Sequence, residues 1–424
     1  MSKQTKKDLV PRLRFPEFRD AGEWVQRPLG KLGQTISGLS GKSGEDFGSG
    51  KPFVTYKQVF DCAWIDFAKC GRVKIADKEK QNELKRGDVL FTTSSETPDE
   101  VGFASVLLDT PPEPVYLNSF CFSFRPDNLD ILKPEFSRYF FHSPIYRKSI
   151  SVLAQGSTRY NISKGAFLKL NLPIPYNGNE QQKIADCLSS VDELITTQAR
   201  KVDALKAHKK GLMQQLFPAE GETVPKLRFP EFRDAGEWEM KTLGQVADYE
   251  NGKAHEQDID EQGKYIVVNS KFVSTAGEVK KFSHAANLLA KKDDILMVLS
   301  DVPNGRAIAK CFYVDKDNTY TVNQRICKLS AKNAVSVMLF YMFDRNSYFL
   351  AFDDGVKQTN LKKDDVLNCP ILLPKDLKEQ QKIADCFTLI DELIVEHAKK
   401  LDILKAHKKG LMQQLFPSPD EVNG

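Results

Sequence analysis

A stretch of 39 residues occurs twice in this chain, and this repeat constrains the fold more than any other feature. Residues 180–218 and 379–417 lie 199 positions apart (379 − 180) and are identical at 29 of 39 positions. Both copies begin with EQQKIADC and end with LKAHKKGLMQQLFP. A repeat of this length indicates that the chain is built from two related halves.

Each copy predicts one long helix. Apolar residues recur at alternating steps of four and three, from Ile184 to Leu216 in the first copy and from Ile383 to Leu415 in the second. This heptad pattern is typical of two helices that pack along a shared seam. At a rise of 1.5 Å per residue, each helix is roughly 55 Å long. An ordinary amphipathic helix of a bundle is the alternative, although globular helices average only about 11–12 residues.

Polar residues interrupt the apolar seam at the same two positions of each copy. These residues are Gln198 and Lys209 in the first copy and His397 and Lys408 in the second. Polar residues in a seam can fix the register and orientation of paired helices. Because the first helix leads into the second block, pairing requires the second helix to return, so we expect the two helices to be antiparallel.

A shorter repeat precedes each variable block. Residues 11–24 and 225–238, which we call the tags, are identical at 13 of 14 positions and share LRFPEFRDAGEW. We expect the tags to dock the chain against a neighbouring helix or to bind a partner. The predicted parts are a first block at 1–179, a helix at 180–218, a second block at 219–378, a helix at 379–417 and a tail at 418–424.

The two variable blocks have a similar order of predicted elements. Short runs rich in β-branched and aromatic residues, bounded by Gly, Pro and Asp, predict strands in both blocks, and each block then has a helical region. The strands are predicted at 52–60, 86–93, 102–108 and 116–124, and at 264–273, 293–300, 306–314 and 320–329; the helical regions are 134–153 and 335–352. The predicted fold is α+β, with two small mixed α/β domains joined by two long antiparallel helices that form a coiled-coil spacer with pseudo-two-fold symmetry.

Composition places further limits on function. The net charge of the 424 residues is only +4 (61 − 57), so any affinity for nucleic acid must come from local patches or be shared with a partner. The eight cysteines form no CxxC pair, which argues against a zinc ribbon or a disulfide framework. The N-terminal segment lacks an apolar signal core and the sequence has no long apolar run, so we expect a cytoplasmic protein without a membrane segment.

The sequence offers no set of residues for catalysis. A methyltransferase acting on a base amine needs an Asn/Asp-Pro-Pro-aromatic loop, and the nearest string, residues 109–113 (DTPPE), has the wrong spacing and no aromatic residue. Glu-x-Lys occurs at 83–85 and 278–280, but without the preceding Pro-Asp that a restriction-type nuclease uses to hold its metal. His208 and His407 have no second metal ligand at usable spacing, so we expect them on helix surfaces. We therefore predict no catalytic residue and no metal site.

Basic, amide and hydroxyl side chains beside Gly and aromatic residues make both blocks candidates for DNA binding. Arg and Lys can read guanine, Asn and Gln can read adenine, and Lys and Ser can bind phosphate. A solvated loop position is the alternative for each of these residues, and Asn161 and Asn360, which recur in both blocks, are expected to hold the loop's shape. The candidates are Lys42, Thr55, Lys57, Gln58, Ser94, Ser95, Ser157, Thr158, Arg159 and Tyr160 in the first block, and Lys253, Asn269, Ser270, Lys271, Asn304, Arg306, Lys357, Gln358 and Asn360 in the second.

The tandem tags, the repeated helices and the two divergent blocks resemble the specificity subunit of type I restriction–modification systems. The closing motifs at 156–175 (GSTRYNISKGAFLKLNLPIP) and 355–374 (GVKQTNLKKDDVLNCPILLP) contribute to this resemblance, which covers residues 11 to 417. It implies two target recognition domains that each read one half of a bipartite site in double-stranded DNA. The helices would then set the spacer between the halves.

The resemblance also implies partners and cofactors. Two methyltransferase subunits would dock on the helices, and restriction subunits would join the full complex. S-adenosylmethionine would belong to the methyltransferase subunits, and ATP and Mg²⁺ to the restriction subunits, so no cofactor is expected on this chain.

Two other functions are open at this point. The first is an enzyme, such as a nuclease or methyltransferase with its own recognition domains. This function would need a catalytic domain, and the two halves leave no room for one. The second is a coiled-coil adaptor that pairs two partner subunits without reading DNA, if the blocks have no base-specific role. The different polar residues of the two blocks favour DNA reading over the adaptor.

Overall fold

The structure is a computed structural model that describes residues 9–156, 159–255, 257–302 and 305–418. The chain divides into two compact units. Unit 1 comprises residues 1–200 and 398–424, and unit 2 comprises residues 201–397. Unit 1 is therefore discontinuous in sequence, because the end of the second long helix belongs to it. Each unit contains one variable block and a segment of each long helix.

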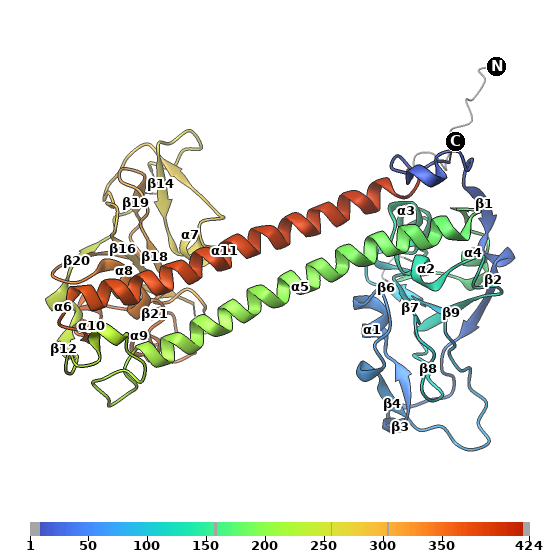
Figure 1. The fold of residues 1–424 in the computed structure, drawn as a ribbon, viewed down its shortest axis with the longest axis horizontal. Coiled ribbons are helices and arrows are strands. Elements are labelled where there is room, and N and C mark those ends of the chain that lie inside the picture. The colour runs from blue at the N-terminus through green and yellow to red at the C-terminus, as the bar shows by residue number, and fades with distance from the viewer. Residues whose placement is uncertain (1–8, 157–158, 256, 303–304, 419–424) are drawn as a thin grey trace. The chain divides into compact units, whose positions relative to one another are not determined.

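The two predicted long helices are confirmed as α5 (Gly178–Leu216) and α11 (Leu377–Gln414), which have 39 and 38 residues (Figure 1). Each begins two residues before its predicted start. Each also ends two or three residues before the predicted end, ahead of Pro218 in the first copy and Pro417 in the second. Proline lacks the amide hydrogen that a helix interior requires.

In unit 1, the first part of α5 packs against the last part of α11 in the opposite direction. Ile184 and Leu188 of α5 share a core cluster with Leu415. Farther along α5, the Asp192 carboxylate forms an ion pair with the Lys408 ammonium at 2.6 Å. Since residue numbers rise along one helix as they fall along the other, the two segments are antiparallel.

Unit 2 repeats this helix packing with the roles of the helices exchanged. The Lys209 ammonium of α5 lies 2.7 Å from the Asp391 carboxylate of α11, and Leu216 shares a core cluster with Ile383 and Phe387. In both units, a lysine that was predicted to fix the seam register pairs with an acid on the facing helix. The structure thus shows the contact that each lysine makes, and its role in fixing the register stays a prediction.

The larger sheets of the two units have four strands and the same topology. The sheet of unit 1 is antiparallel and has the order β2 (Gly33–Ser37), β9 (Cys121–Pro126), β5 (Val89–Thr92) and β7 (Ala104–Val106). The sheet of unit 2 is also antiparallel and has the order β13 (Ala247–Asn251), β20 (Ile326–Ala331), β16 (Ile295–Val298) and β18 (Cys311–Tyr313).

Among the described residues, each unit also has three smaller sheets. The three-stranded sheets are β4 (Gly71–Val73), β3 (Phe47–Val54) and β8 (Tyr116–Leu117) in unit 1, and β15 (Phe282–Ser283), β14 (Tyr265–Val268) and β19 (Tyr320–Val322) in unit 2. The two-stranded sheets of unit 1 are β1 (Val25–Pro28) with β11 (Asn171–Ile174) and β6 (Ser94–Ser95) with β10 (Tyr160–Asn161). Those of unit 2 are β12 (Glu239–Thr242) with β22 (Pro370–Leu373) and β17 (Ser300–Asp301) with β21 (Thr359–Asn360).

Several predicted strands are too long. The strand predicted at 52–60 ends at Val54, and α1 (Tyr56–Asp61) follows, because the Thr55 hydroxyl caps that helix by accepting from the Gln58 amide. Likewise, 264–273 divides into β14 and α7 (Ser270–Ser274), with Asn269 as the cap. Only 311–313 of the strand predicted at 306–314 is extended.

The strands predicted at 116–124 and 320–329 are each interrupted by a turn, which produces β8 and β9 in unit 1 and β19 and β20 in unit 2. Because these turns lie at the ends of two parallel strands, they are important for the candidate site described below.

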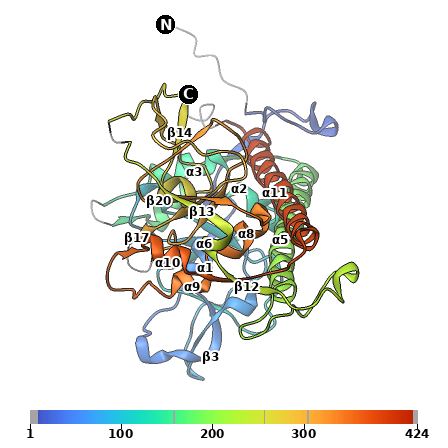
Figure 2. The ribbon, with the colours of Figure 1, turned by 90° about the vertical axis from the view of Figure 1, so that its left-hand side faces the viewer.

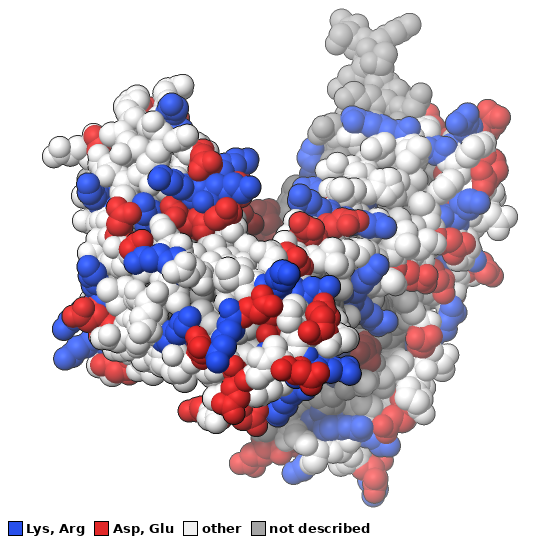
Figure 3. All heavy atoms as spheres, turned by 60° about the vertical axis from the view of Figure 1, so that its left-hand side comes forward, with Lys and Arg blue, Asp and Glu red and all other residues white. Residues whose placement is uncertain are grey.

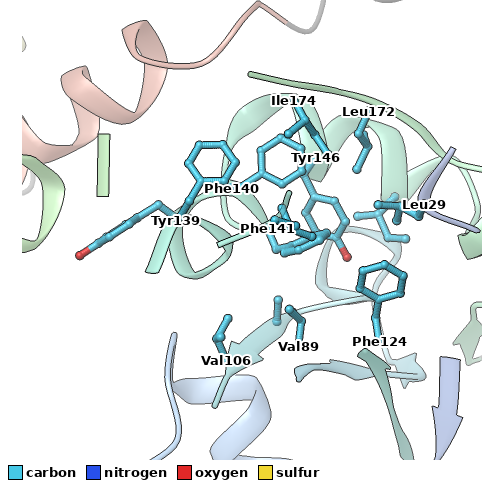
Figure 4. Packing of buried hydrophobic residues seen from close by; sticks show 14 of the residues in the cluster. Leu29, Val89, Val106, Phe124, Tyr139, Phe140, Phe141, Tyr146, Leu172 and Ile174 are labelled. Carbon is cyan, nitrogen blue, oxygen red and sulfur yellow. The ribbon is translucent and has the colours of Figure 1, made fainter. Parts of the chain in front are cut away.

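Short helices within the predicted helical regions 134–153 and 335–352 cover one side of the larger sheet in each unit. In unit 1, α2 (Pro134–Phe140) and α3 (Pro144–Ser151) contribute Phe140 and Tyr146 to a core that also contains Val89 and Phe124 of the sheet (Figure 4). In unit 2, α8 (Ser336–Phe343) and α9 (Ser347–Leu350) replace them, and α6 (Leu243–Val246) and α10 (Lys363–Leu367) pack together beside β13 (Figure 2). The remaining short helix is α4 (Lys164–Leu168) of unit 1.

The tags dock against the helices, as one of their two predicted roles required. Arg14 makes a bidentate ion pair with Glu180 at the start of α5, with both nitrogen–oxygen distances 2.8 Å. Arg228 makes the same pair with Glu379 of α11 at 2.7 Å. The Leu13 amide also donates to the Gln414 carbonyl. Each tag therefore ties the entry of its block to the helix that leaves that block.

No helix among the described residues has the length and apolar character needed to cross a bilayer.

Candidate nucleic-acid interface

In each unit, two parallel strands end side by side and carry polar residues at their ends. The strands are β3 and β8 in unit 1, and β14 and β19 in unit 2 (Figure 1). The Asn118 amide after β8 donates to the Val54 carbonyl at 3.0 Å, and the Asn323 amide after β19 donates to the Val268 carbonyl at 3.1 Å. The carboxyl ends of parallel strands meet at one edge of a sheet, so the residues that follow them come together there.

A turn follows the second of these parallel strands in both units, and we call it the platform turn. It spans 118–121 in unit 1 and 323–326 in unit 2. The carbonyl of its first residue accepts from the amide of its fourth, at 3.0 Å in unit 1 and 2.9 Å in unit 2. Its two central residues are exposed in both units. They are Ser119 and Phe120 in unit 1, and Gln324 and Arg325 in unit 2.

A glycine lies against the first carbonyl of each platform turn. A Cβ atom on Gly38 would be 2.2 Å from the Asn118 oxygen, and one on Gly252 would be 1.9 Å from the Asn323 oxygen. Both distances are far below van der Waals contact. The backbone therefore approaches the turn as closely as only glycine permits, and it does so at equivalent places in the two units.

A two-stranded ladder supports the other side of the platform turn. The Phe120 carbonyl accepts from the Thr93 amide at 3.0 Å, just before β6, and the Arg325 carbonyl accepts from the Leu299 amide at 2.9 Å, just before β17. The ladders β6–β10 and β17–β21 therefore hold the two turns by the same backbone contact. We call the strand ends, the turn and the ladder of each unit its platform.

The platform of unit 2 contains an open cavity of about 280 Å³, and all the residues that line it are of polar or basic type. Among the described residues, the Arg325 guanidinium has no hydrogen-bond or ion-pair partner, and the Ser270 hydroxyl has none either. Such a surface presents several hydrogen-bond donors together. The lining residues are Asn269, Ser270, Lys271, Asn323, Gln324 and Arg325.

The platform of unit 1 has a different surface on the same frame. The Phe120 side chain is 57% exposed, and the Arg159 guanidinium lies 5.9 Å from the centre of its ring. Tyr56 donates its hydroxyl hydrogen to the Ser94 carbonyl at 2.7 Å, and burial raises the pKa of that hydroxyl. Lys57 is exposed beside them. Unit 1 thus presents an aromatic ring and cations, whereas unit 2 presents amides and cations.

Several residues predicted from the first block lie on this platform. Thr55 follows the end of β3, Ser94 and Tyr160 are in the ladder, and Arg159 directly precedes β10; Lys57 lies in α1, which begins at the end of β3. Thr55 has a structural role as the cap of α1, and Ser94 is buried.

Three other predicted residues of the first block are held by contacts within the protein. Lys42 pairs with Glu79 at 2.6 Å, and only 9% of its side chain is exposed. Gln58 is buried, and its amide donates to the Asp66 carbonyl. The buried Ser95 hydroxyl donates to the Glu100 carboxylate. Ser157 and Thr158 lie outside the described residues.

The second block gives a similar result. Asn269, Ser270 and Lys271 line the cavity, and Asn269 also caps α7. The Lys253 amide, next to Gly252, donates to the Val322 carbonyl, and its side chain is exposed.

The remaining predicted residues of the second block lie along or beside its ladder. Gln358 and Asn360 are exposed, and the Gln358 amide donates to the Ser300 hydroxyl at 2.7 Å. Arg306 and Lys357 are exposed outside the cavity lining. Asn304 lies outside the described residues.

The residues of the platform turns were missed by sequence reasoning. A sequence signal was present, because both runs that otherwise predict strands contain an asparagine followed by a second polar residue, NS at 118–119 and NQ at 323–324. Asn favours turns because its side chain can bond to nearby backbone amides. Here the Asn118 side chain accepts from the Phe120 amide at 2.9 Å. An interruption of this kind in two aligned strands would have identified the turn.

Other features of the surface do not indicate a catalytic or metal site. Across the described residues, no group of three His, Cys, Asp or Glu side chains could hold a metal ion. His208 and His407 are exposed on the long helices. Basic and acidic residues are interspersed on the face shown in Figure 3, without a broad area of one sign. This mixture agrees with the small net charge.

Comparison with known proteins gives a consistent family. The family model described as "Type I restriction modification DNA specificity domain" matches residues 22–207 and 235–406. The MjaVIII specificity subunit of Methanocaldococcus jannaschii is 27% identical over 296 residues, covering 66% of this chain and 69% of that protein. The MjaIX specificity subunit of the same organism is 23% identical, covering 93% of this chain and 92% of its own.

Solved structures show the same fold. The crystal structure of the type I restriction–modification S subunit from M. genitalium superimposes with a TM-score of 0.59 at 16% identity, covering 97% of this chain and 100% of that one. A chain from a study of complex assembly and conformational transition of the type I system gives a TM-score of 0.57 at 15% identity, covering 93% and 98%. With two copies of the family's domain, each coinciding with one variable block and its helix, this chain belongs to the specificity subunits of type I restriction–modification systems.

Proposed function

We propose that this chain selects the DNA sequence for a type I restriction–modification complex and performs no catalysis itself. Each unit reads one half of a bipartite site in double-stranded DNA. The platform is the reading surface, and the partner subunits supply the chemistry.

One observation carries this proposal: the two platforms share a backbone frame but present different side chains. The frame consists of the parallel strand ends, the close glycine contact and the ladder. The exposed residues at the centre of the turn are Ser119 and Phe120 in one unit and Gln324 and Arg325 in the other. A scaffold that presents different polar and apolar groups at one place is suited to reading two different short sequences, because base edges are distinguished by such groups.

The small net charge supports a division of labour with partners. Phosphate contacts supply most non-specific DNA affinity, and the 61 basic residues of this chain are nearly balanced by 57 acidic ones. We expect two methyltransferase subunits to supply much of the DNA affinity and to bind S-adenosylmethionine. Restriction subunits would bind ATP and Mg²⁺ in the full complex, which would act on DNA in the cytoplasm.

The long helices are proposed to form the spacer between the half-sites. The ion pairs Lys408–Asp192 and Lys209–Asp391 hold antiparallel segments of α5 and α11 in register within each unit. A continuous antiparallel coiled coil would extend this pairing along both helices and set the length of DNA between the half-sites. Its outer surface would dock the methyltransferase subunits.

Methylome sequencing tests the proposal directly. Cells that carry this chain with its methyltransferase partner are compared with cells that carry the partner alone. We expect a methylated motif of two short halves separated by a fixed gap, which disappears when this chain is absent. A continuous motif, or a motif that persists without the chain, would contradict the proposal.

The alternative is an adaptor that pairs two methyltransferase subunits without reading DNA. It predicts that replacing one variable block by that of a related specificity subunit leaves the methylated motif unchanged. Our proposal predicts that the replacement alters one half of the motif and leaves the other half intact.

A further inference from the structure

The platform turn suggests which side chains select the bases, an inference that rests on the proposed function and makes it more specific. We infer that the two central residues of each turn are the specificity pair of that unit. These pairs are Ser119 and Phe120 in unit 1, and Gln324 and Arg325 in unit 2. Within the pair of unit 2, Arg325 contacts a guanine in the major groove.

The first support is that the surrounding frame fixes the position of each pair. The residue before the pair is an asparagine in both units, and its backbone amide donates a hydrogen bond to a backbone carbonyl of the neighbouring parallel strand. The residue after the pair closes the turn, and Gly38 or Gly252 packs against the turn's first carbonyl at a distance that excludes any side chain. The backbone of both central residues is therefore held, while their side chains extend from the surface. A reading group must be positioned in this way to discriminate between bases.

The second support is that a position near the pair has the same residue type in both units, whereas the pair itself differs between the units. Lys57 and Lys271 occupy the same place after the first parallel strand, and both are exposed. A charge that is common to both platforms suits the phosphate backbone, which is the same in both half-sites. The central pair of the turn differs completely between the units. It therefore suits the bases, which differ.

The third support is the chemistry of the unit 2 pair. The Arg325 guanidinium has no hydrogen-bond or ion-pair partner among the described residues, although it lies in a cavity with other donors. A guanidinium can donate two parallel hydrogen bonds to O6 and N7 of guanine. The adjacent Gln324 side chain is exposed and has both a donor and an acceptor, which suits adenine.

The unit 1 pair predicts a different contact. The Phe120 ring is exposed and apolar, and such a ring can contact the methyl group of thymine. The Arg159 guanidinium near this ring provides a positive charge that can bind phosphate. We therefore expect thymine, rather than guanine, at the position that Phe120 contacts.

The test uses the complex of this chain with its methyltransferase partner. The chain carries either Arg325→Ala or Arg325→Lys, and both a methylome and methylation rates on oligonucleotides are measured. We expect one guanine position in one half-site to become degenerate, while the other half-site stays unchanged. The preference for guanine over the other bases at that position should fall by about 5- to 150-fold, since a bidentate pair discriminates by roughly 1–3 kcal/mol. The lysine variant keeps the positive charge but cannot donate two parallel hydrogen bonds from a planar group. It should therefore also lose most of the preference for guanine.

Two matched control variants distinguish the selection of a base by Arg325 from the general effect of removing a positive charge. Lys271→Ala, in the same cavity, should weaken methylation of all sites uniformly and leave the motif unchanged. Arg233→Ala removes an exposed arginine from the second tag and should change neither rate nor motif. If Lys271→Ala relaxed the motif while Arg325→Ala only slowed methylation, the assignment of roles would be wrong.

The outcomes distinguish this inference from the proposed function. If the unmodified complex gives a bipartite motif and both Arg325 variants retain it with full guanine preference, the inference fails and the proposed function stands. If the unmodified complex gives no bipartite motif that depends on this chain, the proposed function fails first. Thermal unfolding measures whether the alanine variant is folded. If it is not, Arg325→Lys is the test, because lysine keeps the positive charge and a similar length at this exposed position.

Discussion

The near-identity of the tags is explained by a few side chains that make the same contacts in both units. Arg14 and Arg228 each form a bidentate pair with a glutamate at the start of a long helix, and both pairs are almost completely buried. A buried charge that loses its partner is strongly destabilising. The identity of LRFPEF in the two tags therefore agrees with a structural requirement that both units share.

The tag tryptophans differ in one hydrogen bond, which gives a paired test. Trp24 donates to the Glu180 carboxylate at 3.2 Å, whereas the Trp238 indole nitrogen has no partner among the described residues. Both rings are buried, with 1% and 3% exposed. Trp24→Phe should lower the free energy of unfolding by about 1.5–3 kcal/mol more than Trp238→Phe, because only the first loses a hydrogen bond to a charged group. Urea unfolding followed by circular dichroism measures both, and equal losses would show that the hydrogen bond contributes nothing.

At the scale of elements, sequence patterns identified the long helices but fewer than half of the described strands, and they missed the turns. The heptad seam predicted α5 and α11 to within three residues at each end, because a pattern repeated over so many turns is insensitive to any single residue. The runs at 116–124 and 320–329 look like single strands, because apolar and aromatic residues lie on both sides of Asn118 and Asn323. Where a strand breaks depends on its pairing with β3 or β14, which the local sequence does not contain.

The candidate DNA-binding residues were predicted only in part for a similar reason. Lys57 and Lys271 were selected because they are basic residues beside aromatic residues within the predicted strands 52–60 and 264–273. Gln58 was included as well, although the structure buries its amide against the Asp66 carbonyl. Composition identifies a polar residue, but only the fold decides whether its side chain faces solvent.

The glycine that contacts each platform turn provides a test of the frame. Gly252→Ala places a Cβ atom 1.9 Å from the Asn323 oxygen, so the turn must shift. We expect methylation of the complex's target site to fall at least tenfold, with recognition of the unit 2 half-site disturbed and that of the unit 1 half-site retained. Gly211→Ala in α5 is the control, since its added Cβ meets no atom within 4 Å and alanine favours a helix by about 0.5–1 kcal/mol. Normal recognition by Gly252→Ala would show that the turn's position does not matter.

At the scale of the whole molecule, the repeat makes the length of the two helices a variable that can be changed without altering the platforms. Residues 196–202 of α5 and 395–401 of α11 are repeat mates that lie between the ion pairs of the two units. Removing both shortens each helix by roughly 10 Å and keeps the apolar face in phase, because seven residues are close to two turns.

We expect this double deletion to shorten the gap in the methylated motif by about three base pairs, at 3.4 Å per base pair along the DNA axis, while both half-sites keep their sequences. Methylome sequencing provides the measurement. Removing residues 196–202 alone is the control, because the pairs Lys408–Asp192 and Lys209–Asp391 could then no longer form together, and the chain should lose stability. A change in either half-site after the double deletion would contradict the spacer role.

The discontinuous core of unit 1 has a consequence for synthesis on the ribosome. Trp24 near the beginning of the chain packs against Phe416 near its end, with ring centres 6.1 Å apart, and Leu415 shares the same core. Residues 201–397 of unit 2 emerge as one continuous segment and can fold as they appear. The core of unit 1 cannot be completed until the end of α11 has left the exit tunnel, and part of its apolar surface stays exposed to solvent until then. Premature termination before residue 411 therefore yields a nascent chain whose first-made domain is left unfinished, which is the kind of surface that chaperones and proteases recognise.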